Sequence, residues 1–275
     1  MDAGASGPVV RAVVRVSRVP VEHRVGGSLT GSQEGRTGHH VAVGLWSGML
    51  IAEDLLLLLT DDETGKLAAG PGEVDAALGG ALLVELVLMQ RVDLAGSSEQ
   101  VHKGQLIVRD ATATADPLLD EALATVRQNH GRKPQNVVTT LGKGVRVGLY
   151  DRLAGRGLLR AQSGKILGVF PRHSWPALDS SHEDSVRADL LAALRNTMAA
   201  GPRTGALISL LLALNVLHKA VDPAGAGLSQ REMNARAKRI AEGDCASSAV
   251  RHAIDSMHAA VIAATSSAVL PGSGS

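Results

Sequence analysis

One stretch of the chain is apolar on every side of the helix that it would form. Within residues 203–218 (RTGALISLLLALNVLH), only Ser209 and Asn215 are polar between Ala206 and Leu217. A helix that is apolar all round is either buried in a globular core or crosses a membrane. Residues 206–217 would reach roughly 18 Å as a helix, well short of the ~30 Å hydrocarbon core of a bilayer. We therefore predict a buried central helix that other helices cover.

The remaining pattern of apolar and polar positions predicts several further helices. Asp116 followed by Pro117 is typical of a helix start, and Gly157 is typical of a helix end. Gly79 and Gly80 lie inside one of these helices, which is costly unless another backbone packs closely against them. The predicted helices cover residues 49–60, 72–89, 117–130, 134–141, 145–156, 180–198, 229–241 and 244–270.

Short segments of strand character predict two small hairpins. The first pairs Arg91–Leu94 with Gln105–Arg109, and the second pairs Leu158–Ala161 with Lys165–Phe170 around a turn at 162–164. Residues 171–181 are expected to form a loop. The fold class is therefore mostly α, a single globular helical domain over residues 49–270 around a buried central helix, with small β-hairpins and a loose tail at 271–275.

Residues 1–48 differ in character from the rest of the chain. They are rich in Gly, Ser, Val and Arg, contain no lysine and show no lasting helical or strand period. This composition predicts a disordered N-terminal extension. It is either a real flexible arm or the product of a start assigned too far upstream, with Met49 or a nearby residue as the true beginning. The first residues lack the pattern of a secretory signal.

Composition and charge narrow the classes of function. The chain has one Phe, one Tyr and two Trp although 45% of its residues are apolar, so Leu, Val and Ala must fill the core. A net charge of +1 argues against a nucleic-acid partner, which normally requires a strongly basic face. The single Cys245 excludes an intramolecular disulfide, is compatible with a reducing cytoplasm and is interpreted as a small core residue.

The motifs give no support to an enzyme. His252 and His258 are six residues apart, which places them on different faces of a helix, and Gly65-Lys66 lacks the other residues of a phosphate-binding loop. We therefore expect no metal, no cofactor and no catalytic residue. Glu85 lies in an apolar run, where a carboxylate is either a general base or, as we interpret it, a hydrogen-bonding partner of a neighbouring element.

Lys143 and Arg146 are the strongest candidates for a binding site. They lie just before and at the start of a predicted helix, where free backbone N–H groups and the helix dipole favour an anion such as phosphate. The alternative is a pair of solvated surface charges. Arg152 and Arg156 share a face of the same helix, rotated away from Arg146, and are expected to pair with acids such as Asp151 or to stay solvated.

Six segments in order resemble the Golgi phosphoprotein 3 family, in particular its bacterial members. They are LIAEDLLLLLTDDETGKL, ALLVELVLMQRVDL, PLLDEAL, VRVGLYDRLAGRGLL, KILGVFPRHSWP and PRTGALISLLLALNVL, and the similarity covers roughly residues 49–265. The resemblance implies a helical domain that binds phosphatidylinositol 4-phosphate on membranes and recruits cytoplasmic tails of membrane proteins.

The resemblance also implies roles for individual residues. Lys143 and Arg146 match the two basic residues of the family's head-group site, whereas Gly70 and Gly79 stand where the family has a tryptophan and an arginine. Specificity for phosphatidylinositol 4-phosphate is therefore left open, while binding of anionic phospholipid head groups is expected. The family hairpin for membrane contact and self-association matches the region of Phe170 and Trp175, whose alternative role is ordinary packing.

The resulting hypothesis is a non-catalytic, phosphoinositide-binding peripheral membrane adaptor. It would be cytoplasmic, on the inner face of the membrane, and could form a homo-oligomer through the hairpin. The alternative is a soluble protein-interaction module that has lost specific lipid recognition.

Overall fold

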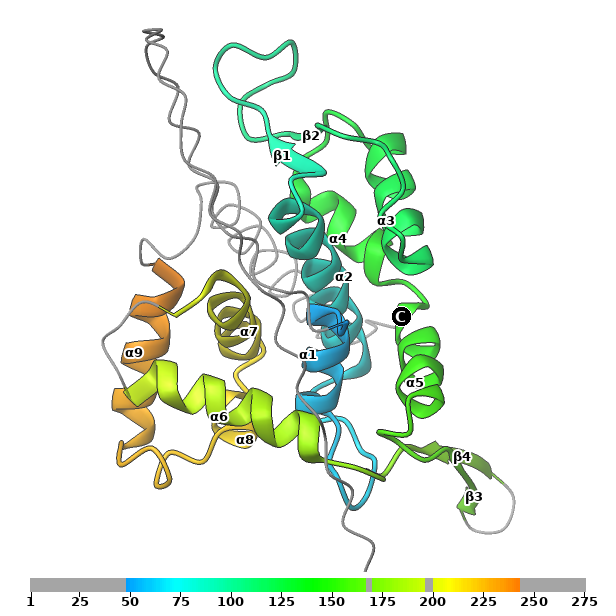
Figure 1. Cartoon of the computed structure of the whole chain (residues 1–275), viewed down its shortest axis with the longest axis vertical. Helices are drawn as coiled ribbons and strands as arrows, with labels where there is room; N and C mark the ends of the chain where they lie inside the picture. Colours follow the sequence, from blue (N-terminus) through cyan, green and yellow to red (C-terminus); the bar gives the residue numbers. More distant parts are fainter. Residues whose placement is uncertain (1–47, 167–169, 196–199, 243–275) are drawn as a thin grey trace, which may run out of the picture. The chain divides into compact units, whose positions relative to one another are not determined.

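The computed structural model describes residues 48–166, 170–195 and 200–242. The chain divides into two compact units, residues 1–45 and 46–275, and all described residues belong to the second. Within the described residues, nine helices and two antiparallel two-stranded sheets confirm the predicted, mostly helical fold with small hairpins (Figure 1). Several predictions concern residues outside these ranges. They are the predictions for the N-terminal extension, the helix 244–270, Cys245, the pair His252 and His258, and the tail.

The helices begin and end close to where local signals predict them. Asp116 accepts hydrogen bonds from the backbone N–H groups of Leu118 (2.9 Å) and Leu119 (3.3 Å), and a proline stands in the first turn of α2, α3, α4 and α7. The helices are α1 (Ile51–Leu59), α2 (Pro71–Leu88), α3 (Pro117–Gln128), α4 (Pro134–Gly142), α5 (Val145–Gly155), α6 (Ser181–Arg195), α7 (Pro202–Ala213), α8 (Leu217–Ala220) and α9 (Gln230–Glu242).

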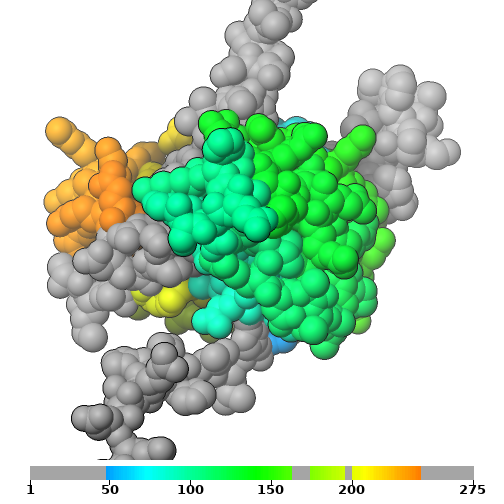
Figure 2. Space-filling model, turned by 90° about the horizontal axis from the view of Figure 1, so that it is seen from above, coloured from blue at the N-terminus to red at the C-terminus, as the bar shows by residue number. Residues whose placement is uncertain are grey.

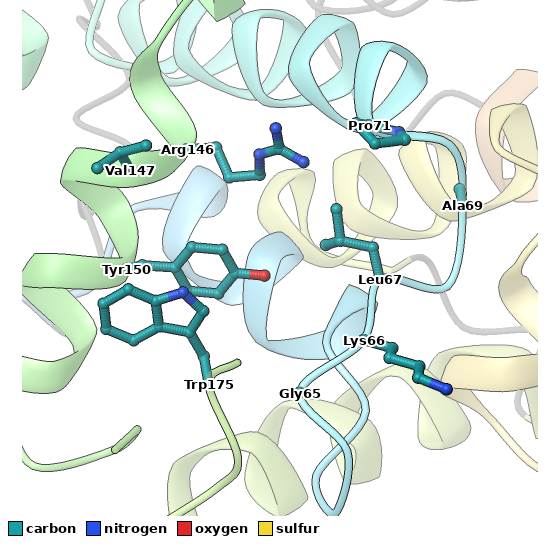
Figure 3. Close-up of a pocket in the computed structure, with 9 residues that line it drawn as sticks. All are labelled: Gly65, Lys66, Leu67, Ala69, Pro71, Arg146, Val147, Tyr150 and Trp175. Atoms are coloured by element: carbon teal, nitrogen blue, oxygen red, sulfur yellow. The ribbon is translucent and has the colours of Figure 1, made fainter. Parts of the chain in front are cut away.

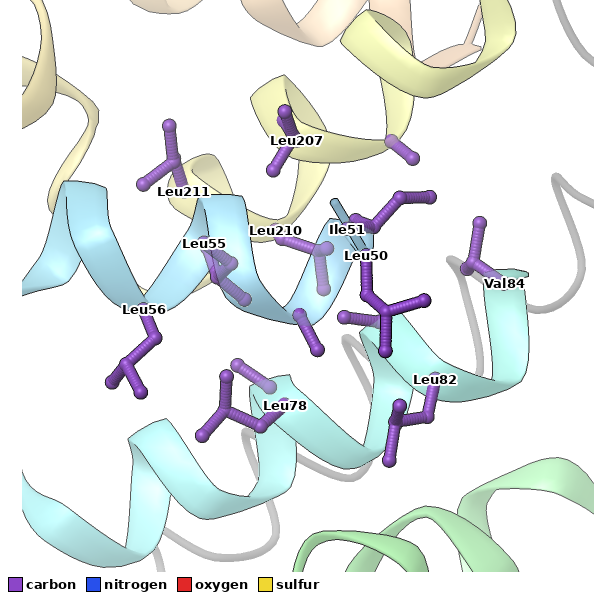
Figure 4. Packing of buried hydrophobic residues seen from close by; sticks show 14 of the residues in the cluster. Leu50, Ile51, Leu55, Leu56, Leu78, Leu82, Val84, Leu207, Leu210 and Leu211 are labelled. Carbon is purple, nitrogen blue, oxygen red and sulfur yellow. The ribbon is translucent and has the colours of Figure 1, made fainter. Parts of the chain in front are cut away.

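The core is built around α1, which is buried at every residue. Helix α1 lies between α2 and α7, with Leu55 and Leu56 directed into the leucine side chains of these neighbours (Figure 4). The predicted buried helix is part of this core, since residues 205–211 of α7 are all buried. None of the described helices combines the length and apolar character needed to cross a membrane.

The apolar stretch 203–218 is not one continuous helix. Helix α7 ends at Ala213, Asn215 has a φ of 55°, and the chain resumes as the short α8. A residue in the left-handed region interrupts the helical hydrogen-bond pattern, and Asn tolerates that region better than most residues. The prediction of a helix reaching Leu217 was therefore wrong in its C-terminal part.

The glycine pair in α2 marks a close approach between helices. A Cβ atom on Gly79 would clash with the carbonyl oxygen of Val138 and would lie 2.6 Å from the amide nitrogen of Gly142 in α4. A Cβ atom on Gly142 would in turn clash with the carbonyl oxygen of Asp75. The expectation that another backbone packs closely here is confirmed at Gly79, and the absence of a side chain at Gly79 is what allows α2 and α4 to touch.

The first hairpin matches its prediction and the second does not. Strands β1 (Val92–Leu94) and β2 (Leu106–Val108) pair as expected, near the surface shown in Figure 2. In the second hairpin, β3 (Gln162–Ile166) pairs with β4 (Phe170–Ser174), so the residues predicted as a turn at 162–164 lie in a strand. The start of the predicted loop 171–181 is also a strand.

Candidate functional site

A cavity of about 510 Å³ opens where the loop after α1, the N-terminus of α5 and the segment after β4 meet. Figure 3 shows the side chains around it. The loop 61–70 turns at Gly65, whose φ is 61° and where a side chain would clash with the backbone of Trp175. The residues that line the cavity are Gly65, Lys66, Leu67, Ala69, Pro71, Arg146, Val147, Tyr150 and Trp175.

Arg146 brings a positive charge to the cavity from the first turn of α5. Its Nε atom lies 3.2 Å from Oδ1 of Asp75 on α2, and both side chains are only partly exposed. Burial raises the pKa of Asp75, whereas the charge of Arg146 opposes that rise. The cavity therefore holds a cation whose charge is partly balanced by a poorly solvated carboxylate.

An aromatic pair forms one wall of the cavity. The rings of Tyr150 and Trp175 are stacked with parallel planes and centroids 4.9 Å apart. The Tyr150 hydroxyl lies 3.0 Å from Oγ1 of Thr60, whose own proton is donated to the carbonyl oxygen of Leu56. Burial raises the pKa of Tyr150, so its hydroxyl stays protonated and fixes the ring against α1. A rigid aromatic wall of this kind suits the flat face of a ring or an apolar group.

Lys66 and Val147 lie at the edges of the cavity. Figure 3 shows the Lys66 ammonium directed away from the Arg146 guanidinium, so the two cations do not converge on one point. Among the described residues, Val147 (63% exposed) and Leu178 (59% exposed) are the large apolar residues that remain exposed. Val147 therefore adds an apolar side chain to the rim of a cavity that also carries positive charge.

The structure does not bring Lys143 and Arg146 into one cavity. Lys143 is the residue that ends α4 and lines a separate depression of about 50 Å³ together with Glu121 and Thr125 of α3. The predicted helix start between the two cations is present, since α5 begins at Val145. Arg146 alone of the two lines the larger cavity.

The two glycines that replace family residues lie in different surroundings. Gly70 lies between Ala69 and Pro71, which both line the cavity, and a Cβ atom at Gly70 would meet the carboxylate of Glu73 at 3.5 Å. Gly79 is buried in the contact between α2 and α4. An arginine at Gly79 would therefore have to push α4 away before it could reach any ligand.

Phe170 and Trp175 do not act as a pair in one strand. Phe170 is the first residue of β4 and pairs with Ile166, while Trp175 follows the strand and stacks on Tyr150 in the cavity. Sequence reasoning therefore missed the aromatic wall, because Tyr150 and Trp175 are brought together only by the tertiary fold. It also missed Asp75 and Lys66, since the pair Gly65-Lys66 was considered only as part of a phosphate-binding loop.

A second charged cluster is structural rather than ligand-binding. The buried carboxylates of Glu53, Asp54 and Glu85 surround the N-terminus of α1. Arg152 donates a hydrogen bond to Glu53 (3.0 Å), and Arg203 donates one to Asp54 (2.7 Å). The expected partner of Arg152, Asp151, is replaced by Glu53 and by Asp116 on α3. Among the described residues, no group of His, Cys, Asp and Glu is arranged to hold a metal ion.

The cavity and the fold define a class of protein. It is a helical domain with a partly exposed pocket that is lined by the cations Arg146 and Lys66, an aromatic pair and an exposed apolar side chain. The model of the Golgi phosphoprotein 3 (GPP34) family matches residues 51–257 of the chain. The chain belongs to the Golgi phosphoprotein 3 family.

A curated relative supports this assignment. Vacuolar protein sorting-associated protein 74 of Eremothecium gossypii is 26% identical over 166 residues, which cover 53% of this chain and 49% of the relative. The chain thus spans about half the length of the curated relative that it matches.

Proposed function

We propose that this protein is a non-catalytic peripheral membrane adaptor that binds phosphoinositide head groups such as that of phosphatidylinositol 4-phosphate. Membership of the Golgi phosphoprotein 3 family supports this proposal. The observation that carries it is the cavity in which Arg146 stands at the N-terminus of α5 beside the exposed Val147. The phosphate would accept hydrogen bonds from Arg146, and Val147 would enter the lipid surface.

The aromatic wall fits the same ligand class. A head-group ring would lie against Tyr150 or Trp175, which supply a flat surface from positions other than Gly70. The proposal has three further parts. The protein would bind cytoplasmic tails of membrane proteins, it would self-associate through the β3–β4 hairpin, and it would lie on the inner face of the membrane. Lys143 would contribute as a second, separate cation near the same end of α5.

Vesicle co-sedimentation tests the proposal and separates the two cations. We expect binding to phosphatidylcholine vesicles that contain phosphatidylinositol 4-phosphate and little binding to phosphatidylcholine alone. Arg146→Ala should weaken binding about tenfold or more, because a charge-assisted hydrogen bond contributes ~1.5–3 kcal/mol. Lys143→Ala should weaken it less, because Lys143 lies outside the cavity.

A surface lysine far from the cavity in sequence serves as the control for this experiment. Lys103→Ala removes an exposed positive charge next to the β1–β2 hairpin and should leave binding unchanged. Equal binding by the wild type and Arg146→Ala would refute the site. No sedimentation with any anionic vesicle would favour the alternative, a soluble interaction module without lipid recognition.

A further inference from the structure

Arg146 meets its carboxylate partner differently from the two arginines that hold α1 in place. Arg152 donates two hydrogen bonds to Asp116, at 3.0 and 2.7 Å, and Arg203 donates two to Asp54, at 3.2 and 2.7 Å. The closest contact of Arg146 with Asp75 joins Nε to Oδ1 at 3.2 Å, and Oδ1 of Asp75 has no hydrogen-bond partner among the described residues. The Asp75–Arg146 pair is therefore held by charge rather than by directed hydrogen bonds.

This geometry leaves the terminal nitrogens of Arg146 available to a ligand. Within the described residues, no hydrogen bond to Nη1 or Nη2 of Arg146 is present, and Figure 3 shows the guanidinium directed across the cavity toward Pro71. A phosphate could accept hydrogen bonds from both terminal nitrogens while Asp75 remains beside Nε. Such a phosphate would then carry its negative charge close to the carboxylate of Asp75.

We propose that Asp75 is a built-in counter-charge that lowers the affinity of the Arg146 cavity for phosphate monoesters. The inference rests on the proposed function, because it requires an anion to enter this cavity. Charges in a partly buried site are weakly screened, so the repulsion by Asp75 offsets much of the attraction by Arg146. A ligand must then form direct hydrogen bonds with Arg146 to remain bound, since attraction at longer range is nearly cancelled.

Asp75→Asn isolates this effect. The substitution removes the negative charge, keeps the shape of the side chain and leaves an oxygen atom facing Arg146. The matched control is Glu63→Gln, which removes one negative charge from the exposed loop 61–66 without touching an ion pair of the described residues. Thermal unfolding of each variant establishes that it is folded, and Asp75→Ser serves as a second variant that also removes the charge.

Binding is measured with two sources of the phosphate monoester. One is the soluble head group of phosphatidylinositol 4-phosphate, followed by calorimetry, and the other is that lipid in phosphatidylcholine vesicles. We expect Asp75→Asn to bind the soluble head group about tenfold more tightly than the wild type. Glu63→Gln should match the wild type. In Arg146→Ala, the additional change Asp75→Asn should still strengthen the remaining binding, because Asp75 repels the phosphate directly.

Each outcome distinguishes the inference from the proposed function. Unchanged or weaker binding by Asp75→Asn, with wild-type binding to vesicles intact, would overturn the counter-charge and leave the lipid function standing. A gain from Asp75→Asn that disappears in Arg146→Ala would overturn it too, because Asp75 would then act by pairing with Arg146 and not by repelling the phosphate. Asp75→Asn could bind the soluble head group more tightly while neither the wild type nor any variant binds vesicles. This outcome would support the counter-charge and refute the membrane function. If neither the wild type nor any variant binds the soluble head group or the vesicles, both the counter-charge and the proposed function would be overturned.

Discussion

At the scale of single residues, Glu85 is a buried carboxylate that holds the start of α1. Its Oε2 atom accepts a hydrogen bond from the backbone N–H of Ile51 (2.5 Å), and its Oε1 atom lies 3.4 Å from Nη1 of Arg203. Burial raises the pKa of Glu85 to about 7. The role expected from sequence, a hydrogen bond to a neighbouring element, agrees with these contacts. The partner, Ile51, lies 34 positions away in sequence.

The raised pKa predicts a pH dependence of stability. The ordinary pKa of this group is 4.5, so between about pH 4.5 and 7 the folded protein holds a proton that the unfolded chain has lost. The stability that this proton contributes is present below pH 4.5 and is lost as pH rises through about 7. In Glu85→Gln, which keeps an acceptor for Ile51, this loss should be absent.

Chemical denaturation across this pH range measures the effect. The stability of the wild type relative to Glu85→Gln should fall by on the order of 3 kcal/mol between the two ends of the window. Glu183, whose pKa is also raised to about 7, is unchanged in both proteins and cancels in the difference. The control Glu63→Gln, at an exposed residue, should show the same dependence of unfolding free energy on pH as the wild type. A difference in unfolding free energy between wild type and Glu85→Gln that does not change with pH would contradict the prediction.

Single residues also show where sequence reasoning stops. Lys143 and Arg146 are three positions apart and both flank a helix start, yet they line different depressions because one ends α4 and the other lies inside α5. The stacking of Tyr150 on Trp175 and the pairing of Arg146 with Asp75 join segments far apart in the chain. Local spacing contains no information on such contacts.

At the scale of elements, the contact between α2 and α4 depends on Gly79. Gly79→Ala would place a methyl group against the carbonyl oxygen of Val138, so the two helices would have to separate. We expect a loss of about 2 kcal/mol or more in the free energy of unfolding, measured by urea denaturation. Gly72→Ala, in the exposed first turn of the same helix, meets no atom within 4 Å and should be neutral or slightly stabilising. Equal effects of the two substitutions would show that α2 and α4 do not touch at Gly79.

Elements with local start and stop signals were predictable, and those without them were not. Asp116-Pro117 and Gly157 fixed the ends of α3 and α5 to within two residues, because caps depend on neighbouring residues. The break at Asn215 was missed because apolar residues continue on both sides of it. The register of β3 with β4 was missed because Gly164 resembles a turn residue, whereas here it lies in a strand opposite Arg172.

At the scale of the whole molecule, the most apolar segment and the proposed membrane contact lie in different places. Residues 206–211 of α7 are buried against other helices, whereas Val147 stands exposed at the rim of the cavity. Burial of leucines in a core and contact with lipid both follow from the hydrophobic effect, and only the fold decides which residues are left for lipid. Hydropathy along the chain is therefore a poor guide to the surface that we propose for membrane contact.

Labelling from within the bilayer tests this separation directly. A lipid-soluble photoreactive reagent, applied to protein bound to vesicles with phosphatidylinositol 4-phosphate, should modify the peptide that contains Val147 and spare residues 206–211. Peptide mass spectrometry locates the label. In Arg146→Ala, which should bind the vesicles about tenfold or more weakly, labelling at Val147 should fall accordingly. Thermally unfolded protein should be labelled in its apolar segments as well. Label in residues 206–211 of the folded, bound protein would mean that α7 leaves the core to meet the bilayer, and a peripheral mode of attachment would then be wrong.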